Sequence, residues 1–251
     1  MRGNVLLTRL PEQNRCFIAL CYEHGDVDSV KRLNFYSKPL LTCEAIELGE
    51  DTKRHILGLD VFDYIIFISK NAVKFGLPRL QNYWPQWPQS LTWFAVGPGT
   101  AHHLRIEDLE VYSPSQSSSE GLLAMTELQA PVGKKVLIVR GVGGRETLKE
   151  GLQGRGASVD YAEVYRREII NYESADWVAS GEKVFALVYS GEALIHLSRL
   201  LGILLTQYCL IVPSRRLQLM AIDEGFGKVE LASSQQDSDM LESLLKCIEK
   251  Q

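Results

Sequence analysis

The most constraining feature of the sequence is an internal repeat that places a serine after a buried strand in each half of the chain. The stretch IFISKNAV ends an apolar run at Ser69, and LVYSGEAL ends another at Ser190. Further segments match in the same order, among them VLLTR with VLIVR, which sets Arg9 against Arg140. The period is much longer than that of a solenoid repeat. The repeat therefore predicts two similar domains.

Strand-like and helical patterns alternate along both halves. Short, nearly continuous apolar runs are typical of parallel strands that are covered on both faces. Helical segments such as EALIHLSRLLGILL and RRLQLMAIDEGFG follow several of them. This alternation predicts an α/β fold with parallel sheets and right-handed crossovers. The expected strands are residues 5–8, 64–68, 93–96, 136–139, 185–189 and 209–212, with two further extended segments at 38–48 and 158–170.

Length and composition fit a soluble protein of two ordinary domains. The chain has 251 residues, of which 45% are hydrophobic and 23% charged, so it can bury ample core. The net charge of -4 gives no electrostatic reason to expect nucleic acid or an anionic membrane as a partner. The most apolar stretch, residues 200–212, is too short to span a bilayer. We therefore expect no nucleic acid and no membrane among the partners.

The cysteines and histidines lack the spacing of metal sites. The five cysteines are scattered, without a CxxC pattern, and most have apolar neighbours, which predicts buried free thiols. Free thiols indicate a reducing compartment, and the N-terminal segment MRGNVLLTRL has none of the features of a signal peptide. We expect a cytoplasmic protein with neither a metal nor a cofactor.

Five small, hydroxylic or basic corners follow the expected strands. In open parallel sheets ligands bind at the carboxyl ends of strands, where helix N-termini offer unpaired N–H groups and favour anions. One such corner is usually an ordinary helix cap, but five in two domains indicate a site for a polyanionic small molecule. The corners are Ser69-Lys70-Asn71, Gly97-Pro98-Gly99-Thr100, Gly141-Val142-Gly143-Gly144-Arg145, Ser190-Gly191 and Pro213-Ser214-Arg215.

The residues leave several alternatives open. RGVGGRE suggests a dinucleotide site and a nucleotide-dependent oxidoreductase, but Glu146 stands where the third glycine belongs. A non-catalytic two-domain binding protein for a small polyanionic ligand fits the same corners, although an export signal is missing. Tyr165 is either a core residue with a hydrated hydroxyl or part of the site.

The ordered set of motifs resembles the uroporphyrinogen-III synthase family over nearly the whole chain. The motifs are VLLTR, FISKNAV, AVGPGTA, SSEGLL, VLIVRGVGGRETLKEGLQGRGASVDYAEVYRR, VYSGEAL and VPSRRLQLMAIDEGF. Two places depart from the family pattern: Pro11 comes one position late after Arg9, and Arg215 replaces a second hydroxyl residue.

The resemblance implies a particular domain arrangement. Family members have two similar parallel-sheet α/β domains joined by a two-stranded linker, with the substrate cleft between them. By analogy, residues 1–37 with 168–251 form one discontinuous domain, and residues 38–167 form the other. The resemblance also favours a monomer.

The resemblance further implies a cofactor-free lyase of tetrapyrrole and heme biosynthesis. Such a hydro-lyase cyclises hydroxymethylbilane with loss of water and inversion of ring D, through a spiro-pyrrolenine, to uroporphyrinogen III. We expect transient contact with hydroxymethylbilane synthase. By position in the family motifs, Tyr165 would donate a proton to the leaving hydroxyl. Substrate carboxylates would meet Ser69, Thr100, Ser190 and Ser214, and we add Arg9, Arg140 and Arg145 as charge partners.

Overall fold

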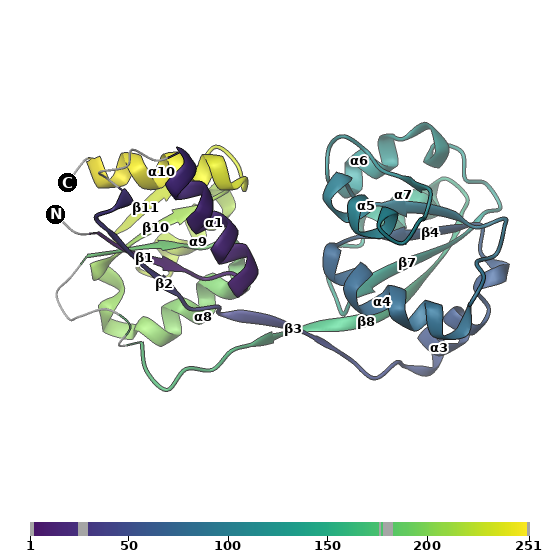
Figure 1. The fold of residues 1–251 in the computed structure, drawn as a ribbon, viewed down its shortest axis with the longest axis horizontal. Helices are drawn as coiled ribbons and strands as arrows, with labels where there is room; N and C mark the ends of the chain where they lie inside the picture. Colours follow the sequence, from purple (N-terminus) through teal and green to yellow (C-terminus); the bar gives the residue numbers. More distant parts are fainter. Residues whose placement is uncertain (1–2, 25–29, 176, 178–182, 250–251) are drawn as a thin grey trace. The chain divides into compact units, whose positions relative to one another are not determined.

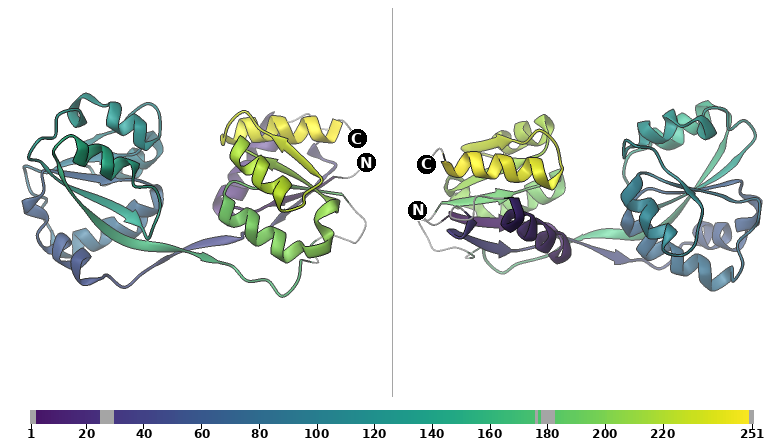
Figure 2. Two further views of the ribbon diagram at one scale, coloured as in Figure 1. Left: turned by 180° about the vertical axis from the view of Figure 1, so that it is seen from behind. Right: turned by 45° about the horizontal axis from the view of Figure 1, so that its top comes forward.

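The computed structural model describes residues 3–24, 30–175, 177 and 183–249, and its ribbon is drawn in Figure 1. The chain divides into two compact units. Unit 1 consists of Met1–Thr42 and Glu168–Gln251, and unit 2 of Cys43–Arg167. Within each unit, helices lie against both faces of a sheet (Figures 1 and 2). Strand β1 pairs in parallel with β2 and β9, β10 with β9, and β4 with β5 and β7, so the predicted α/β class with parallel sheets is confirmed.

Residues 38–42 group with unit 1, whereas the expected domain limit lay before residue 38. Leu40 is fully buried in the core of unit 1. The backbone N–H groups of Lys38 and Leu40 donate to the carbonyls of Leu7 and Thr8. Burial and backbone pairing therefore carry this segment beyond the limit that the resemblance implied.

Unit 1 contains a five-stranded sheet in the order β11-β10-β9-β1-β2. Its core has two halves, one on each face. Leu6 of β1 packs with residues of α8 and α9, while its neighbours Val5 and Leu7 pack with residues of α1 and α10. This alternation follows from the two-residue period of a strand. The elements are β1 (Gly3–Leu7), α1 (Pro11–His24), β2 (Leu33–Ser37), β9 (Val184–Leu187), α8 (Gly191–Leu201), η3 (Gly202–Gln207), β10 (Tyr208–Val212), α9 (Arg215–Asp223), β11 (Lys228–Leu231) and α10 (Asp237–Glu249).

Unit 2 is built on a six-stranded sheet in the order β3-β8-β7-β4-β5-β6. Helices α3, α4 and α5 pack on one face, and α6 and α7 on the other. Gly76 lets α4 approach the sheet closely, because a Cβ atom there would lie 2.7 Å from Val139 Cγ1. The elements are β3 (Leu41–Ala45), α3 (Glu50–Leu57), η1 (Leu59–Val61), β4 (Tyr64–Phe67), α4 (Lys70–Tyr83), β5 (Thr92–Ala95), α5 (Pro98–Arg105), β6 (Val111–Tyr112), α6 (Ser119–Ala124), η2 (Thr126–Leu128), β7 (Lys135–Gly141), α7 (Thr147–Gly154) and β8 (Ser158–Ile169).

Strands β3 and β8 connect the units. They are neighbours in the sheet order, and the division between the units falls within both strands. Backbone hydrogen bonds flank the pair: Ile46 N–H donates to Val164 O at 3.4 Å, and Ile170 N–H to Leu40 O at 3.0 Å. The two extended segments expected at 38–48 and 158–170 therefore become one paired crossing.

The sequence repeat and the structural units do not coincide. Read from one edge, unit 1 runs β11, β10, β9, β1, β2, and unit 2 runs β6, β5, β4, β7, β8. The strands before Ser190 and Ser69 thus take equivalent places in the two sheets. Each unit combines the first two strands of one repeat with the last three of the other. Arg9 therefore belongs to the same unit as Ser190, and Arg140 to the same unit as Ser69.

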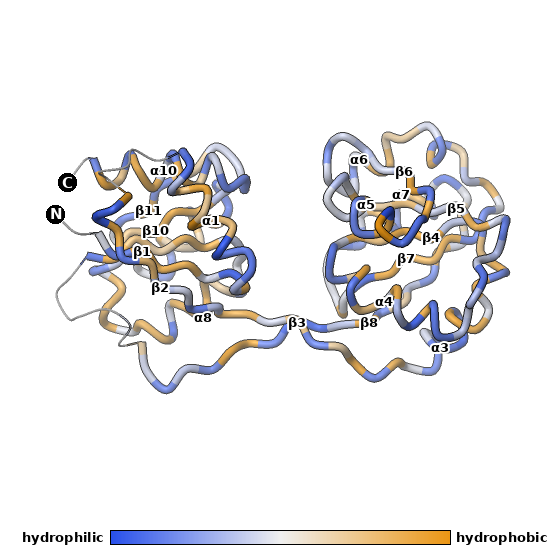
Figure 3. Tube along the Cα trace, viewed as in Figure 1, coloured by the Kyte–Doolittle hydropathy of each residue, from blue (hydrophilic) through white to orange (hydrophobic). Residues whose placement is uncertain are grey.

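Hydropathy follows this layering. In Figure 3 central strands such as β1, β10, β4 and β7 are mainly apolar, whereas loops and parts of the helices are polar. Among the described residues, every helix falls short of the length and apolar character needed to cross a membrane. The cysteines are free thiols, but the expectation of burial is wrong for Cys16, which is exposed on α1.

Candidate functional site

The predicted serine corners are helix N-caps at the carboxyl ends of strands. Ser69 follows β4, and its Oγ accepts a hydrogen bond from Ala72 N–H at 2.9 Å. Ser190 and Ser214 cap α8 and α9 in the same way, accepting from the N–H groups three residues later at 3.2 and 3.4 Å. Because the first turn of a helix keeps other N–H groups unpaired, each corner remains suited to bind an anion.

Tyr165 lies on β8 of the same sheet, and its side chain reaches the Ser69 corner. Its hydroxyl lies 3.0 Å from Ser69 Oγ, its ring stacks on Phe75 at 5.6 Å between centroids, and the residue is only 5% exposed. The register between β7 and β8 shifts between Arg140 and Gly141, so that Gly141 is paired with Tyr165. A Cβ atom at Gly141 would lie 2.7 Å from Tyr165 Cζ, so the glycine makes room for the ring. Tyr165 is therefore a core residue whose hydroxyl belongs to the corner.

Thr100 lies in the first turn of α5 rather than at its cap. The cap is Gly97, and Thr100 is 6% exposed. The side chain of Lys70, at the start of α4, extends over this turn, since a Cβ atom at Gly99 would lie 3.1 Å from Lys70 Cε. Burial, together with the positive charges of Lys70 and His102, lowers the pKa of His103. The N-termini of α4 and α5 thus share one cationic neighbourhood.

Arg140 holds the glycine-rich loop that follows β7. Its side chain is 2% exposed, and its Nη1 donates to Glu146 Oε1 at 3.0 Å. Its Nη2 donates to the carbonyl of Gly143, and the guanidinium lies 4.4 Å from the Tyr161 ring centroid. Gly143 has φ of 72°, which favours glycine. The charge of Arg140 is therefore already engaged inside the protein.

Two pKa shifts reflect the Arg140 network. Tyr161 hydroxyl donates to Glu146 Oε2 at 2.6 Å. This hydrogen bond is the main reason why the pKa of Glu146 lies below its usual value, and the contact with Arg140 lowers it further. Burial acts in the opposite direction but does not outweigh them. Burial and the same carboxylate raise the pKa of Tyr161 to about 12. Both groups therefore keep the protonation states that hold the loop at neutral pH.

Arg145 is exposed near the end of the same loop. Hydrogen bonds to the Glu120 backbone and to the Ser118 side chain lower the pKa of Glu120. The charge of Arg145 lowers this pKa further, by a smaller amount. Ser118 caps α6, as the sequence pattern SSSEGLL indicates. Unlike Arg140, Arg145 presents its guanidinium to solvent.

In unit 1 the Ser190 and Ser214 corners adjoin each other. Their strands β9 and β10 are parallel neighbours. Arg216, in the first turn of α9, lies near the start of α8, because a Cβ atom at Gly191 would lie 3.4 Å from its Nη1. This arrangement resembles that of Lys70 and Gly99 in unit 2, since in both units a cation from one helix N-terminus covers a glycine at the N-terminus of a neighbouring helix.

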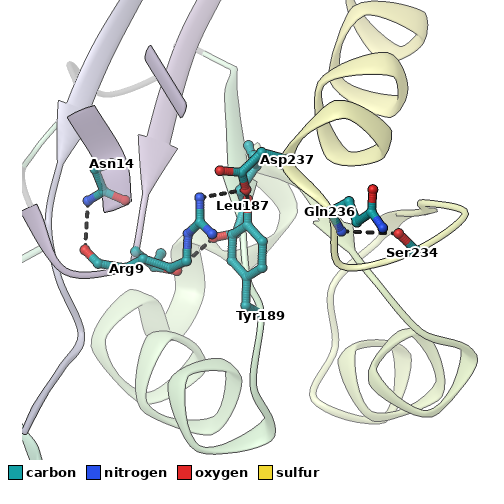
Figure 4. Close-up of polar contacts among 8 residues, drawn as sticks. Arg9, Asn14, Leu187, Tyr189, Ser234, Gln236 and Asp237 are labelled. Carbon is teal, nitrogen blue, oxygen red and sulfur yellow. Dashed lines mark hydrogen bonds and ion pairs between the residues drawn. The ribbon is translucent and has the colours of Figure 1, made fainter. Parts of the chain in front are cut away.

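Arg9 lies just after β1 and is fixed by Tyr189, in the loop between β9 and α8, and by Asp237 of α10. Figure 4 shows its guanidinium between Tyr189 and Asp237. Arg9 Nη2 is 2.7 Å from Asp237 Oδ1, and Arg9 Cζ is 4.1 Å from the Tyr189 ring centroid. The loop backbone is also held, because Asn14 Nδ2 donates to Arg9 O at 2.7 Å. Arg9 is thus an ordered cation at the strand ends of unit 1.

Sequence reasoning assigned no individual role to four side chains at these corners. Lys70 and Arg216 stand inside motifs that were identified, but only the fold shows that each covers a neighbouring glycine. Tyr189 stands in the motif VYSGEAL, whereas Asp237 lies outside the quoted motifs and is far from Arg9 in the chain. Within the described ranges, no three His, Cys, Asp or Glu side chains are grouped closely enough to hold a metal ion.

Comparison with known proteins identifies the family. Residues 34–242 match the uroporphyrinogen-III synthase HemD family. The chain belongs to the uroporphyrinogen-III synthase family. The uroporphyrinogen-III synthase of Escherichia coli K12 is 33% identical over 200 residues, which cover 75% of this chain and 81% of that protein. That of Salmonella typhimurium is 33% identical over 193 residues, covering 72% and 78%.

Solved synthase structures share the fold. The uroporphyrinogen-III synthetase of Helicobacter pylori 26695 superposes with a TM-score of 0.63 at 17% identity, covering 98% of this chain and all of that one. A mutant synthase of the extremely thermophilic bacterium Thermus thermophilus gives 0.59 at 15% identity, covering 99% and 100%. Membership of the uroporphyrinogen-III synthase family makes the chain an enzyme of porphyrin and heme biosynthesis that acts on a small-molecule substrate.

Proposed function

We propose that this synthase is a lyase that closes hydroxymethylbilane to uroporphyrinogen III, with loss of water and inversion of ring D. The observation that carries the proposal is the pairing of Tyr165 hydroxyl with Ser69 Oγ, 3.0 Å apart at the carboxyl end of β4. A phenol held at a helix N-terminus is a suitable proton donor for a leaving hydroxyl. Family membership supports the choice of substrate.

Tyr165 starts the reaction by donating its proton to the hydroxyl of the hydroxymethyl group. The hydroxyl leaves as water, and the pyrrole that carried it becomes an electron-poor, protonated azafulvene. Ser69 Oγ already accepts from Ala72 N–H, so its own proton is free to be donated to the Tyr165 oxygen once the phenol has lost its proton. The positive end of α4 favours the negative charge that forms there.

Ring closure depends chiefly on how the substrate is folded. Spontaneous closure gives the type I isomer, so the protein must hold ring D for attack through a spiro-pyrrolenine and reclosure. Positioning supplies this selectivity. We assign the substrate carboxylates to the helix N-termini and hydroxyls of the corners, each unit by itself, at Ser69, Thr100, Ser190 and Ser214.

The arginines have different parts in this proposal. Arg9 and Arg145 retain exposed guanidinium surface and would pair with substrate carboxylates. Arg140 is buried and ion-paired, so it would act indirectly by holding residues 141–146. Lys70 and Arg216 would add charge at the corners that they cover. Several weak contacts of this kind make binding distributed rather than dependent on one residue.

The setting of the reaction follows from the substrate. Because hydroxymethylbilane closes spontaneously to the wrong isomer, a short path from its source is an advantage. We therefore propose a cytoplasmic monomer without a cofactor that contacts hydroxymethylbilane synthase transiently.

The test is the isomer composition of the product. Hydroxymethylbilane is generated in situ, the protein is added, and the oxidised uroporphyrins are separated by chromatography. We expect predominantly type III, at a rate that rises with protein concentration. Type I alone, formed at the spontaneous rate by folded protein, would refute the proposal. Binding of hydroxymethylbilane without any change in isomer ratio would identify a non-catalytic binding protein instead.

A further inference from the structure

The guanidinium of Arg9 is held on two sides by side chains from distant parts of unit 1. Asp237, the first residue of α10, accepts a hydrogen bond from Arg9 Nη2 through Oδ1 at 2.7 Å. On the other side, the centroid of the Tyr189 ring lies 4.1 Å from Arg9 Cζ. Tyr189 hydroxyl also donates to Asp237 Oδ1, at 3.4 Å. The three side chains therefore form a closed group, in which each contacts the other two (Figure 4).

One donor of this guanidinium, Nη1, remains available to a ligand, whereas Nε is shielded inside the protein. Among the described residues, Nη1 has no hydrogen-bond partner, and Nε is buried without one. The Arg9 side chain keeps 19% of its surface exposed. An unpaired donor in a partly buried cation is costly unless a ligand completes its hydrogen bonds.

The group lies at the edge of the sheet where unit 1 presents its other anion-binding corners. Strands β1 and β9 are parallel neighbours, so Arg9 and Tyr189 both follow strand ends at the carboxyl edge. Ser190, which caps α8, follows Tyr189 directly in the chain. Thr8 Oγ1 donates to Leu187 O at 2.6 Å and fixes the two strand ends against each other.

We propose that Asp237 and Tyr189 are positioning residues, which hold Arg9 so that its unpaired Nη1 binds one carboxylate of the substrate. This inference rests on the proposed function. Asp237 acts through Arg9 and does not itself touch the substrate. The guanidinium bridges two carboxylates, one from Asp237 and one from the ligand, as its five donors allow.

The physical benefit is preorganisation. A free arginine loses considerable rotamer freedom when it binds a carboxylate, whereas a side chain fixed by a ring and an ion pair has lost that freedom on folding. Asp237 is itself favoured at the positive end of α10. Burial raises the pKa of Tyr189. The charge of Arg9 lowers this pKa and the carboxylate of Asp237 raises it, and the net effect keeps the hydroxyl a donor at neutral pH.

Kinetics of Asp237→Asn distinguish this role from a general electrostatic one. Removing a negative charge near a site for a polyanion should lower KM if only the local potential matters. If Asp237 positions Arg9, KM instead rises about threefold to tenfold, with little change in kcat. Asp239→Asn is the matched control, because it removes the same charge from the same helix turn, and the structure gives Asp239 no side-chain contact with Arg9.

A double-mutant cycle shows whether Asp237 acts through Arg9. In the Arg9→Gln background, Asp237→Asn should leave KM unchanged. An equal increase in both backgrounds, or a fall in KM in the parent background, would overturn the proposal. If Asp237→Asn does not fold, Tyr189→Leu is used in the same cycle, since it removes the ring and leaves the ion pair.

A second readout does not depend on catalysis. In ¹H–¹⁵N spectra the Nε–H signal of Arg9, assigned by its loss in Arg9→Lys, should exchange slowly with solvent. It should exchange faster in Asp237→Asn but not in Asp239→Asn. Unchanged exchange in Asp237→Asn would overturn the positioning role even if the protein makes type III product. Faster exchange in a protein that makes only type I would leave the positioning of Arg9 supported and refute the proposed reaction.

Discussion

Replacing Gly141 with alanine should damage catalysis more than folding. The added methyl group would lie 2.7 Å from Tyr165 Cζ and 2.8 and 3.1 Å from its Cε2 and Cε1. Carbon atoms pack at roughly 3.5–4.0 Å, so the ring must shift by about 1 Å. Tyr165 is 5% exposed and packs on Phe75, which leaves the ring little room to move without disturbing its neighbours.

The shift carries the phenol away from Ser69. A movement of about 1 Å would lengthen the 3.0 Å contact with Ser69 Oγ beyond hydrogen-bonding range. Misplacement by this amount costs on the order of 100-fold in rate when a group must be held for proton transfer. Overpacking in a dense interior destabilises by roughly 1–3 kcal/mol. The free energy of unfolding therefore falls moderately, while kcat for type III formation falls strongly.

Two assays on the same variants decide the outcome. Thermal unfolding reports stability, and the initial rate of type III formation below the melting transition reports catalysis. Gly154→Ala is the control, since a Cβ atom at that end of α7 meets nothing within 4 Å. Tyr165→Phe sets the scale of the loss expected when the phenol is absent. A folded Gly141→Ala protein with the parent's kcat would refute the role assigned to Tyr165.

Three further predictions concern single side chains. Ser69→Ala should lower the free energy of unfolding by about 1 kcal/mol, through loss of the α4 cap, and should weaken type III formation without abolishing it; complete loss in a folded variant contradicts distributed binding. Lys70→Ala should raise KM severalfold with kcat retained, measured by steady-state kinetics; an unchanged KM removes Lys70 from the site. Hydrogen bonds from the Lys134 side chain and from the Lys135 N–H lower the pKa of Asp63. The ionised carboxylate therefore stabilises the folded protein above the unfolded-state pKa, and this stabilisation is lost as the pH falls through the folded-state pKa. Asp63→Asn should therefore have a lower free energy of unfolding than the parent at pH 7, by less than about 1 kcal/mol because both partners are partly exposed. Thermal unfolding at several pH values measures this difference, which should vanish in acid.

Local patterns were sufficient for the apolar strands and the helix caps. The apolar runs around residues 64–68 and 209–212 became β4 and β10, within one or two residues of the expected limits. Ser69, Ser190 and Ser214 became N-caps, because a hydroxyl before a helical segment satisfies an N–H group only a few residues away. Strands β2, β6 and β11 were not predicted, since they are short or mainly polar and have no clear apolar run.

The repeat was visible in the sequence, but its exchange between the units was known only from the family resemblance. Nothing in the periodicity of residues 1–37 says which sheet β1 joins, because both sheets offer similar apolar neighbours. The choice depends on long-range strand pairing, such as that of β1 with β9 and of β7 with β4. Hence the sequence predicted two similar domains, and the fold decided which strands each contains.

By itself the sequence determined most of the elements, the fold class, the helix caps and the family, because each depends on neighbouring residues or on motifs in order. Tertiary structure alone decided which side chains meet. Ser69 and Tyr165 are 96 positions apart, and Arg9 and Asp237 are 228 positions apart, yet each pair is within hydrogen-bonding distance. Likewise, Arg140 has the sequence context of a ligand-binding arginine but is buried and paired with Glu146. Contacts of this kind arise from the packing of strands and helices that are remote in the chain, so no local pattern encodes them.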